Sequence, residues 1–273
     1  MTGRVKLSPL SIAVGAVFIF LYAPIVVLVM FAFNESALSY TWTGFTLKWF
    51  EELASERILL TWRNTLLVSV GVVITATLIG TMAAYALVKY TFRGKFLVIA
   101  FMLVPIIIPR SIVGIAMLVT LNYLGVPRSL LTVGLGQVFY VLPFVVIAIV
   151  SVIIVFDKRL EEAAMDLGAN AWITFRRVTL PLIMNGIATG AAVAFILSFS
   201  EFTLSYYLAG EQQTLPIYIL SEFRFLITPK INALSTSIVA IVIVVTLLTE
   251  FFRRRTAIQR RRERPSIAIG EPG

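Results

Sequence analysis

The sequence of 273 residues contains no cysteine and no histidine. Without cysteine, the chain has no disulfide framework, no thiol nucleophile and no thiolate metal ligand. Without histidine, it also lacks the commonest general base and a principal ligand of zinc and iron. Charged residues are scarce too, at 14% of the chain, whereas soluble domains carry about a quarter. These absences argue against catalytic residues, a metal site or a bound cofactor in this chain.

Hydrophobic residues are abundant instead, at 59% of the chain. One soluble core cannot hide this much apolar surface, so the composition predicts an all-α integral membrane protein. A bilayer-spanning helix needs about 20 mainly apolar residues, and six stretches meet this requirement. They are residues 11–33, 65–88, 96–121, 135–156, 185–209 and 233–252. We expect residues 1–256 to form one six-helix membrane domain and residues 257–273 to form a basic, disordered cytoplasmic tail.

Lysine and arginine are distributed unevenly around these stretches. Of the 23 basic residues, 16 lie at the N-terminus, in the second–third and fourth–fifth connections and in the C-terminal tail. Because loops rich in Lys and Arg are cytoplasmic, both termini are predicted to be cytoplasmic. The net charge of +9 then reflects topology and attraction to anionic lipid, and not nucleic-acid binding, since no nucleic-acid-binding module accompanies the basic tail.

The outer connections carry different chemistry. Aromatic residues are interspersed with polar ones between Trp42 and Glu52. Amphipathic aromatic side chains favour the membrane interface, so this segment is predicted to form a short interfacial helix. Residues 211–232 are expected on the same, outer side.

The connection between the fourth and fifth stretches combines small, acidic and turn-forming residues. Glu162 and Asp166 are four residues apart and so share one helix face, and the two alanines between them allow another protein to approach closely. Gly168 suits a left-handed turn after that helix, and Pro181 suits the first turn of the next. The complete set is Glu161, Glu162, Ala163, Ala164, Asp166, Gly168, Leu180 and Pro181. It predicts a short helix, a turn and a second short helix along the membrane surface.

This segment, residues 161–181, resembles the EAA loop of ABC-transporter permeases, and we call it the EAA-like loop. The family pattern is Glu-Ala-Ala, three residues, Gly, nine residues, Ile, one residue and Leu-Pro; only Val178 departs from it. The resemblance implies the Type I importer architecture and a pair of separate ATP-binding subunits that dock on this loop. ATP and Mg²⁺ would bind to those partners, since the chain has no G-x-x-x-x-G-K-[ST] phosphate loop.

Much of the remaining chain resembles the polyamine-type branch of these importer permeases, of which the spermidine/putrescine permease is an example. The resemblance rests on residues 90–95, 142–146, 195–198, 215–216 and 228–236. It implies a multi-pass subunit of a bacterial or archaeal inner membrane. Its partners would be a second permease subunit, favoured as a paralogue, an extracellular solute-binding protein and membrane lipid.

Two charges lie inside predicted spans, where an ionisable residue is a functional candidate by default. Arg110 directly follows Pro109 in the third stretch, and Glu201 follows Ser198 and Ser200 in the fifth. At about 1.5 Å per residue, the two charges reach similar depths in the membrane. They either line the path of the solute or pair with each other to hold two helices together.

Prolines 105 and 109 are predicted to open or kink the third helix just below Arg110, freeing carbonyl groups to line a cavity. Polyamine permeases tend to carry an acidic residue at the Arg110 position. A guanidinium there disfavours a polycation and favours a carboxylate or phosphonate, so opines, amino-acid-like solutes and aminoalkylphosphonates stay open beside polyamines. The function expected is alternating-access import of a small polar solute; the alternative is an ion channel or ion-coupled carrier without an ATPase.

Overall fold

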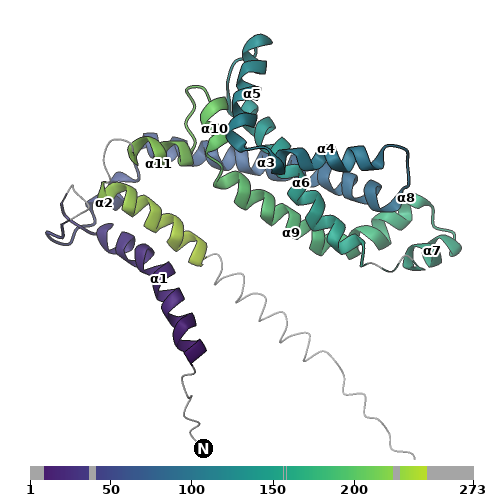
Figure 1. Ribbon diagram of the computed structural model, residues 1–273, viewed down its shortest axis with the longest axis horizontal. Helices are drawn as coiled ribbons and strands as arrows, with labels where there is room; N and C mark the ends of the chain where they lie inside the picture. The colour runs from purple at the N-terminus through teal and green to yellow at the C-terminus, as the bar shows by residue number, and fades with distance from the viewer. Residues whose placement is uncertain (1–8, 37–40, 156, 158, 224–227, 245–273) are drawn as a thin grey trace, which may run out of the picture. The chain divides into compact units, whose positions relative to one another are not determined.

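The computed structural model describes residues 9–36, 41–155, 157, 159–223 and 228–244 (Figure 1). Over these residues the chain is nearly all helical; its extended pairing is one isolated bridge between Asn34 and Phe45, and no strand is present. Two compact units divide the chain, a larger one at Glu56–Ser221 and a smaller one that combines Met1–Ser55 with Glu222–Gly273. The boundary predicted between residues 256 and 257 lies outside the described residues.

Within the described part of the chain, four helical runs are long and apolar enough to cross a membrane: α1 (Pro9–Phe31), α3 (Glu56–Lys89), α6 (Leu130–Ile153) and the run Ala171–Phe199. A bent pair, α4 (Lys95–Ile107) and α5 (Arg110–Tyr123), would make a fifth. The predicted all-helical membrane fold is therefore confirmed, with four candidate spans, or five if the bent pair counts as one span. The predicted sixth span begins within the helix Pro229–Val244 and continues beyond the described residues.

The larger unit is built on three mutually packed helices, α3, α6 and α9 (Leu180–Phe199) (Figure 1). Small residues make the close approach possible. A Cβ added at Gly80 of α3 would lie 2.7 Å from a methyl carbon of Val145, and one at Gly190 of α9 would lie 3.1 Å from the same atom. Val145 and Ile149 of α6 are completely buried in this seam. At these positions the three spans are held together by close packing of glycine against aliphatic side chains.

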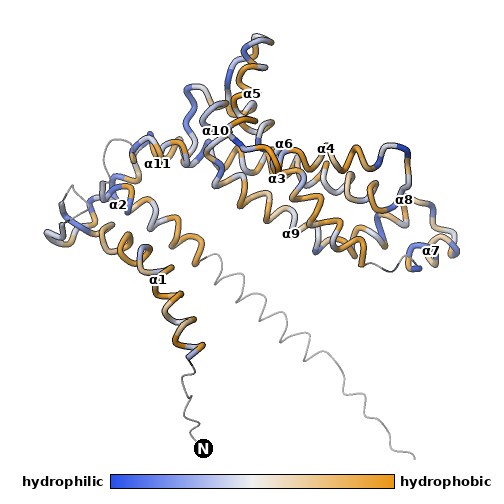
Figure 2. The backbone as a smooth tube through the Cα atoms, viewed as in Figure 1, coloured by the Kyte–Doolittle hydropathy of each residue, from blue (hydrophilic) through white to orange (hydrophobic). Residues whose placement is uncertain are grey.

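The outer surface of the larger unit is apolar. Figure 2 shows hydrophobic residues along the length of α4, where the side chains of Phe96, Phe101 and Ile107 are each 79% exposed. In a soluble protein such a surface would be buried or would aggregate. In a bilayer it faces lipid or another membrane subunit.

The third predicted span does not form one kinked helix. The axes of α4 and α5 differ by 104°, which is far more than a kink. The reason is Pro109, which disfavours helical geometry in the residue before it: Ile108 is extended, with φ −78° and ψ 133°. Pro105 lies buried inside α4 and does not break it. The predicted opening below Arg110 is thus present, but at one proline only.

The fifth predicted span, residues 185–209, was placed too far along the chain. Its helix begins at Ala171 and ends at Phe199, with α8 (Ala171–Thr174) and a five-residue π-helix, η1 (Phe175–Thr179), leading into α9. A separate short helix, α10 (Thr203–Leu208), follows. The apolar run conceals this break because the turn at Ser200 and Glu201 is stabilised by side-chain hydrogen bonds and not by hydropathy.

In the smaller unit, the connection after α1 folds on a buried asparagine. The side chain of Asn34 accepts a hydrogen bond from the backbone N–H of Thr43 (3.0 Å) and donates one to the carbonyl of Thr41 (2.7 Å). The indole N–H of Trp49 donates to the Asn34 carbonyl at 2.7 Å. The predicted short helix is present as α2 (Lys48–Glu52). Trp49 is buried beside Ala32 and Ala233 and is no interfacial anchor.

Candidate functional site

The EAA-like loop begins with an eight-residue helix, α7 (Arg159–Asp166), that ends in a left-handed turn at Gly168 (φ 89°). The backbone N–H of Gly168 donates to Met165 (2.9 Å), and that of Ala169 donates to Ala164 (3.1 Å). These two bonds form a Schellman motif, which needs a residue that tolerates positive φ at Gly168. The side chain of Asn170 then caps α8 by accepting the N–H of Ile173. The predicted helix and turn are confirmed.

The second half of the EAA-like loop departs from the prediction. Helix α8 does not end before Pro181; it continues through η1 into α9. The N–H of Leu180 donates to the carbonyl of Phe175, five residues back, which defines the wide π turn. A proline within a helix removes one donor and crowds the carbonyl four residues earlier. The wide turn just before Pro181 accommodates that crowding, so the loop joins span five without a break.

The exposed side of α7 carries the acidic pair. Glu162 and Asp166 are exposed and form no ion pair with any other described residue, and Ala163 between them is also exposed. Two large apolar side chains extend this surface: Leu167 is 90% exposed and Trp172 is 67% exposed. Exposed apolar residues beside acidic ones are typical of a protein-docking surface. The sequence does not single out Leu167 and Trp172 as surface residues, because apolar residues are common throughout this hydrophobic chain.

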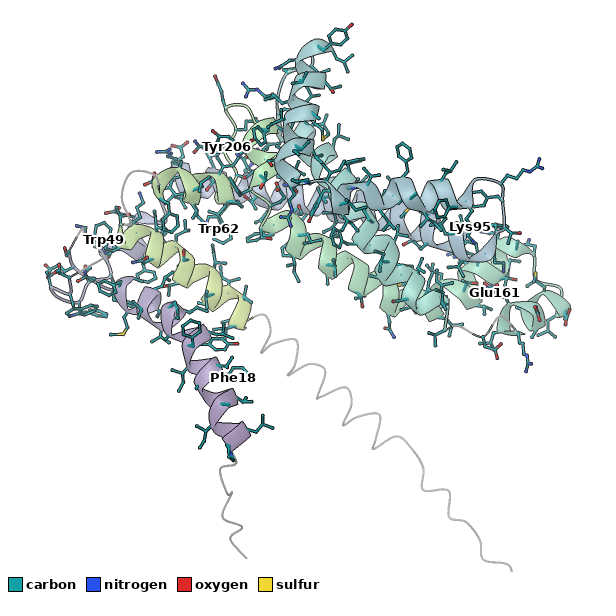
Figure 3. The ribbon with its side chains drawn as sticks, viewed as in Figure 1. Phe18, Trp49, Trp62, Lys95, Glu161 and Tyr206 are labelled. Carbon is teal, nitrogen blue, oxygen red and sulfur yellow. The ribbon has the colours of Figure 1, made fainter. Side chains whose placement is uncertain are left out.

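Glu161, the neighbour of Glu162, faces the interior of the larger unit and not the solvent. It is 4% exposed, and its carboxylate lies between the Lys89 ammonium at the end of α3 and the Thr179 hydroxyl of η1. Figure 3 shows Glu161 at the same end of the larger unit as Lys95, which follows the α3–α4 connection. Consecutive helical residues do not share a face, so a helix at this position separates Glu161 from Glu162. Which of the two is buried depends on how α7 packs.

Arg110 begins α5 at the break and is exposed. Its guanidinium carbon lies 4.5 Å from the ring centroid of Tyr140 on α6. Tyr140 is buried and packs against Phe144 at 5.5 Å between ring centroids. A cation over the face of an aromatic ring is attracted by the ring's electrons, so Tyr140 positions the guanidinium. Tyr140 is a site residue that the sequence did not reveal.

Glu201 does not pair with Arg110. It is 1% exposed, and its carboxylate accepts the backbone N–H groups of Leu204 (3.0 Å) and Ser205 (3.1 Å) at the start of α10. Ser200 is exposed, and its hydroxyl donates to the carbonyl of Ile196. The structure therefore brings Glu201 to the turn before α10 and leaves Arg110 stacked on Tyr140.

A buried polar network joins four helices beside Glu201. The Ser198 hydroxyl of α9 donates to Oε1 of Gln137 on α6 and lies 3.2 Å from the Ser69 hydroxyl of α3. The Gln137 amide nitrogen donates to the Ser205 hydroxyl of α10 at 3.0 Å. Every member is satisfied, as burial in an apolar medium requires. Of this network, sequence reasoning had named Ser198 alone.

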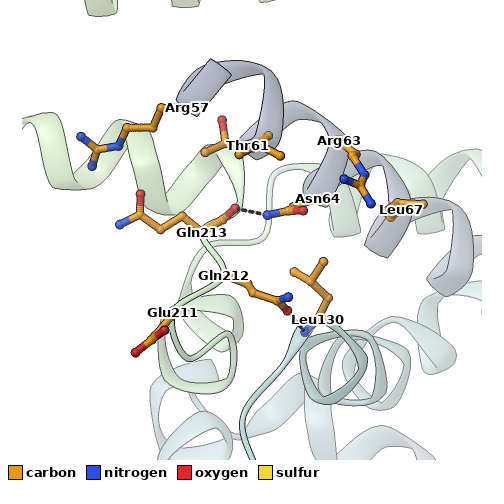
Figure 4. Close-up of a pocket in the computed structure, with 10 residues that line it drawn as sticks. Arg57, Thr61, Arg63, Asn64, Leu67, Leu130, Glu211, Gln212 and Gln213 are labelled. Atoms are coloured by element: carbon orange, nitrogen blue, oxygen red, sulfur yellow. Dashed lines mark hydrogen bonds between the residues drawn. The ribbon is translucent and has the colours of Figure 1, made fainter. Parts of the chain in front are cut away.

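A pocket of about 550 Å³, whose lining residues are mostly polar, lies near the other end of α3 from Lys89 (Figure 4). Arg57 and Arg63 from the first turns of α3 line it with Glu211 and Gln212. The Asn64 side chain fastens the 211–213 segment by donating to the Gln213 carbonyl at 2.9 Å. Within the described residues, no three acidic side chains converge in a way that could hold a metal ion.

Several apolar candidate spans and a broken third helix are the features of a multi-pass membrane protein. Residues 76–262 match the family model described as the inner membrane component of binding-protein-dependent transport systems. The chain belongs to this family and is a permease subunit of an ABC importer.

Two relatives from Escherichia coli K12 resemble almost the whole chain. The spermidine/putrescine transport system permease PotC is 33% identical over 241 residues, which cover 88% of this chain and 91% of PotC. The putrescine transport system permease PotI is also 33% identical, over 90% of this chain and 91% of PotI. The fold is similar to that of a bacterial ABC transporter involved in alginate import, with a TM-score of 0.70 at 20% identity over 89% of this chain and 94% of that chain.

Proposed function

We propose that the chain moves a small polar solute into the cytoplasm by alternating access, with six spans and with both termini cytoplasmic. One observation carries the proposal: the exposed acidic and small-residue face of α7, ended by Gly168, offers a docking surface for an ATP-binding subunit. Closure of the ATPase pair would displace the EAA-like loop. Because this loop is continuous with α9, its displacement would tilt a span.

The partners follow from this role. We propose that a pair of ATP-binding subunits holds ATP and Mg²⁺, that a second, paralogous permease completes the membrane pore, and that a solute-binding protein delivers the solute from outside an inner membrane. The pocket between Arg57, Arg63 and Glu211 lies at the end of α3 that this topology places outside. Its mixed charges suit transient contact with a polar solute or a delivering protein.

The solute is proposed to be of the polyamine type, because PotC and PotI are named as spermidine and putrescine permeases. One observation favours a second candidate. Arg110 is exposed at the break of the third span, and a guanidinium binds a carboxylate or phosphonate. A thermal-shift screen of the binding protein against polyamines, opines, amino acids and aminoalkylphosphonates decides between the two classes.

Reconstitution tests the importer function. Liposomes that contain this chain, the second permease and the ATPase pair are expected to take up solute only with ATP on the ATPase side and binding protein on the other. Omitting the ATPase pair is the control and is expected to remove uptake. Solute or ion flux through this chain without ATP would instead establish the channel or carrier alternative.

Cysteine labelling tests the orientation of the chain in the membrane. Because the sequence has no cysteine, only the introduced cysteine of this chain can react. Ala54→Cys, between α2 and α3, is expected to react with a membrane-impermeant maleimide in intact cells. Ala169→Cys, in the turn after α7, is expected to react only after permeabilisation. Labelling of Ala169→Cys in intact cells would reverse the proposed topology.

A further inference from the structure

Helix α7 is attached to the larger unit by a charged side chain. Of its eight residues, Glu161 is the one that is buried. A surface helix is normally held by an apolar stripe that faces the core. Here a carboxylate occupies the buried position, and carboxylates are rarely buried unless they are paired. A charge at the one buried position of α7 requires an explanation beyond packing.

Each oxygen of this carboxylate has its own partner. Oε2 accepts from the Lys89 ammonium, which ends α3, and Oε1 accepts from the hydroxyl of Thr179, the buried last residue of η1. Hydrogen bonds to charged groups are about twice as strong as neutral ones and are directional. One side chain therefore ties α7 to the ends of two packed spans, α3 and α9, which meet in the seam of the larger unit.

The spans themselves do not depend on this contact. The ring of Tyr85 on α3 packs edge-on against Phe175 of η1, with ring centroids 5.2 Å apart. The apolar seam further along α3 and α9 is independent of α7. Loss of the Glu161 contacts should therefore release α7 while the three spans stay packed. The contact between the Tyr85 and Phe175 rings is not directional, so the rings can shift relative to each other. The two charge-assisted hydrogen bonds of Glu161 are directional, so they resist displacement of α7 relative to α3 and η1.

We propose that Glu161 is a positioning residue that transmits displacement of the EAA-like loop to α3 and α9, while the exposed Glu162 serves docking. This inference rests on the proposed docking of an ATPase at α7. It adds that docking and transmission are performed by adjacent glutamates on different faces of one helix, one exposed and one buried. Thr179 is the last residue of the π-helix η1, which leads directly into α9, and π turns occur frequently at functional sites.

The test compares Glu161→Gln with Glu162→Gln, a matched pair that removes one charge from each face. Three quantities are measured: co-purification of the ATPase, ATP hydrolysis stimulated by loaded binding protein, and uptake in liposomes. We expect Glu161→Gln to keep the ATPase bound but to lower uptake about tenfold or more, with hydrolysis no longer responsive to binding protein. We expect Glu162→Gln to lose the ATPase. Equal loss of ATPase binding in both variants, or wild-type uptake by Glu161→Gln, would overturn the proposal.

Two further variants distinguish loss of the Thr179 hydrogen bond from misfolding. Thr179→Val removes the hydroxyl at nearly constant volume and is expected to lower uptake, whereas Thr179→Ser keeps the hydroxyl and is expected to behave as the wild type. Equal uptake by the valine and serine variants would contradict transmission through Thr179. If the wild-type chain binds no ATPase at all, the proposed function fails and this inference fails with it. If the wild type binds the ATPase and Glu161→Gln imports normally, the inference alone fails.

Discussion

Replacing Gly168 with valine is expected to reduce ATP-driven uptake to background while the membrane bundle stays folded. Gly168 has φ 89°, a backbone conformation that costs a residue with a Cβ about 1–2 kcal/mol, and a β-branched residue more. No atom lies within 4 Å of an added Cβ, so the effect comes from the backbone alone. Relief of the strain breaks the bonds from Gly168 and Ala169 back to α7 and reorients the docking surface.

Gly94 provides the matched control. It has φ 85°, and an added Cβ there would also meet nothing within 4 Å. It lies before α4, in the connection that follows α3, and outside the EAA-like loop. Gly94→Val therefore carries the same backbone cost without touching the docking surface, and we expect it to keep ATPase co-purification and most of the uptake. Equal loss of uptake in the two variants would mean that strain at any helix end disables the protein, and the coupling role of Gly168 would be withdrawn.

Glu201→Leu is expected to produce the largest loss of stability in the chain. Its carboxylate satisfies two buried backbone N–H groups, those of Leu204 and Ser205. An orphaned buried donor costs about 1–3 kcal/mol, so the loss of two partners should lower the free energy of unfolding by roughly 2–6 kcal/mol. Glu201→Gln keeps an amide oxygen as acceptor and should lose much less. The midpoint of thermal unfolding in detergent measures the difference between the two variants.

The same experiment separates the two roles considered for Arg110. Because Arg110 is exposed and its interaction is a ring stack on Tyr140, Arg110→Met should change stability little. It should lower uptake if the guanidinium contacts the solute. The double variant Arg110→Met with Glu201→Leu should then show additive losses of stability, as expected for residues that share no bond. Rescue of stability in the double variant would establish an Arg110–Glu201 pair in another conformation of the transporter.

Much of the fold was accessible from local signals in the sequence. Runs of apolar residues predict helices in a bilayer because each span satisfies its own backbone hydrogen bonds. Gly168 and its spacing from Glu162 predict the short helix and its turn, because positive φ is a property of a single residue. Helix ends were less accessible. Helix α6 begins at Leu130, five residues before the predicted start, because Ser129 and Thr132 form a capping box that hydropathy does not detect.

What the sequence determined by itself is the membrane class, the EAA-like loop and the presence of Arg110 and Glu201 within apolar surroundings. Only the tertiary structure decided which groups the charged side chains contact, both in the EAA-like loop and at Arg110 and Glu201. Glu161 and Glu162 are chemically identical neighbours, yet one bonds Lys89 and Thr179 and the other is exposed. The 104° break between α4 and α5, and the turn before α10, likewise determine that Arg110 meets Tyr140 while Glu201 bonds α10. Such pairings join residues far apart in the chain, so they depend on how helices pack and leave no trace in local composition.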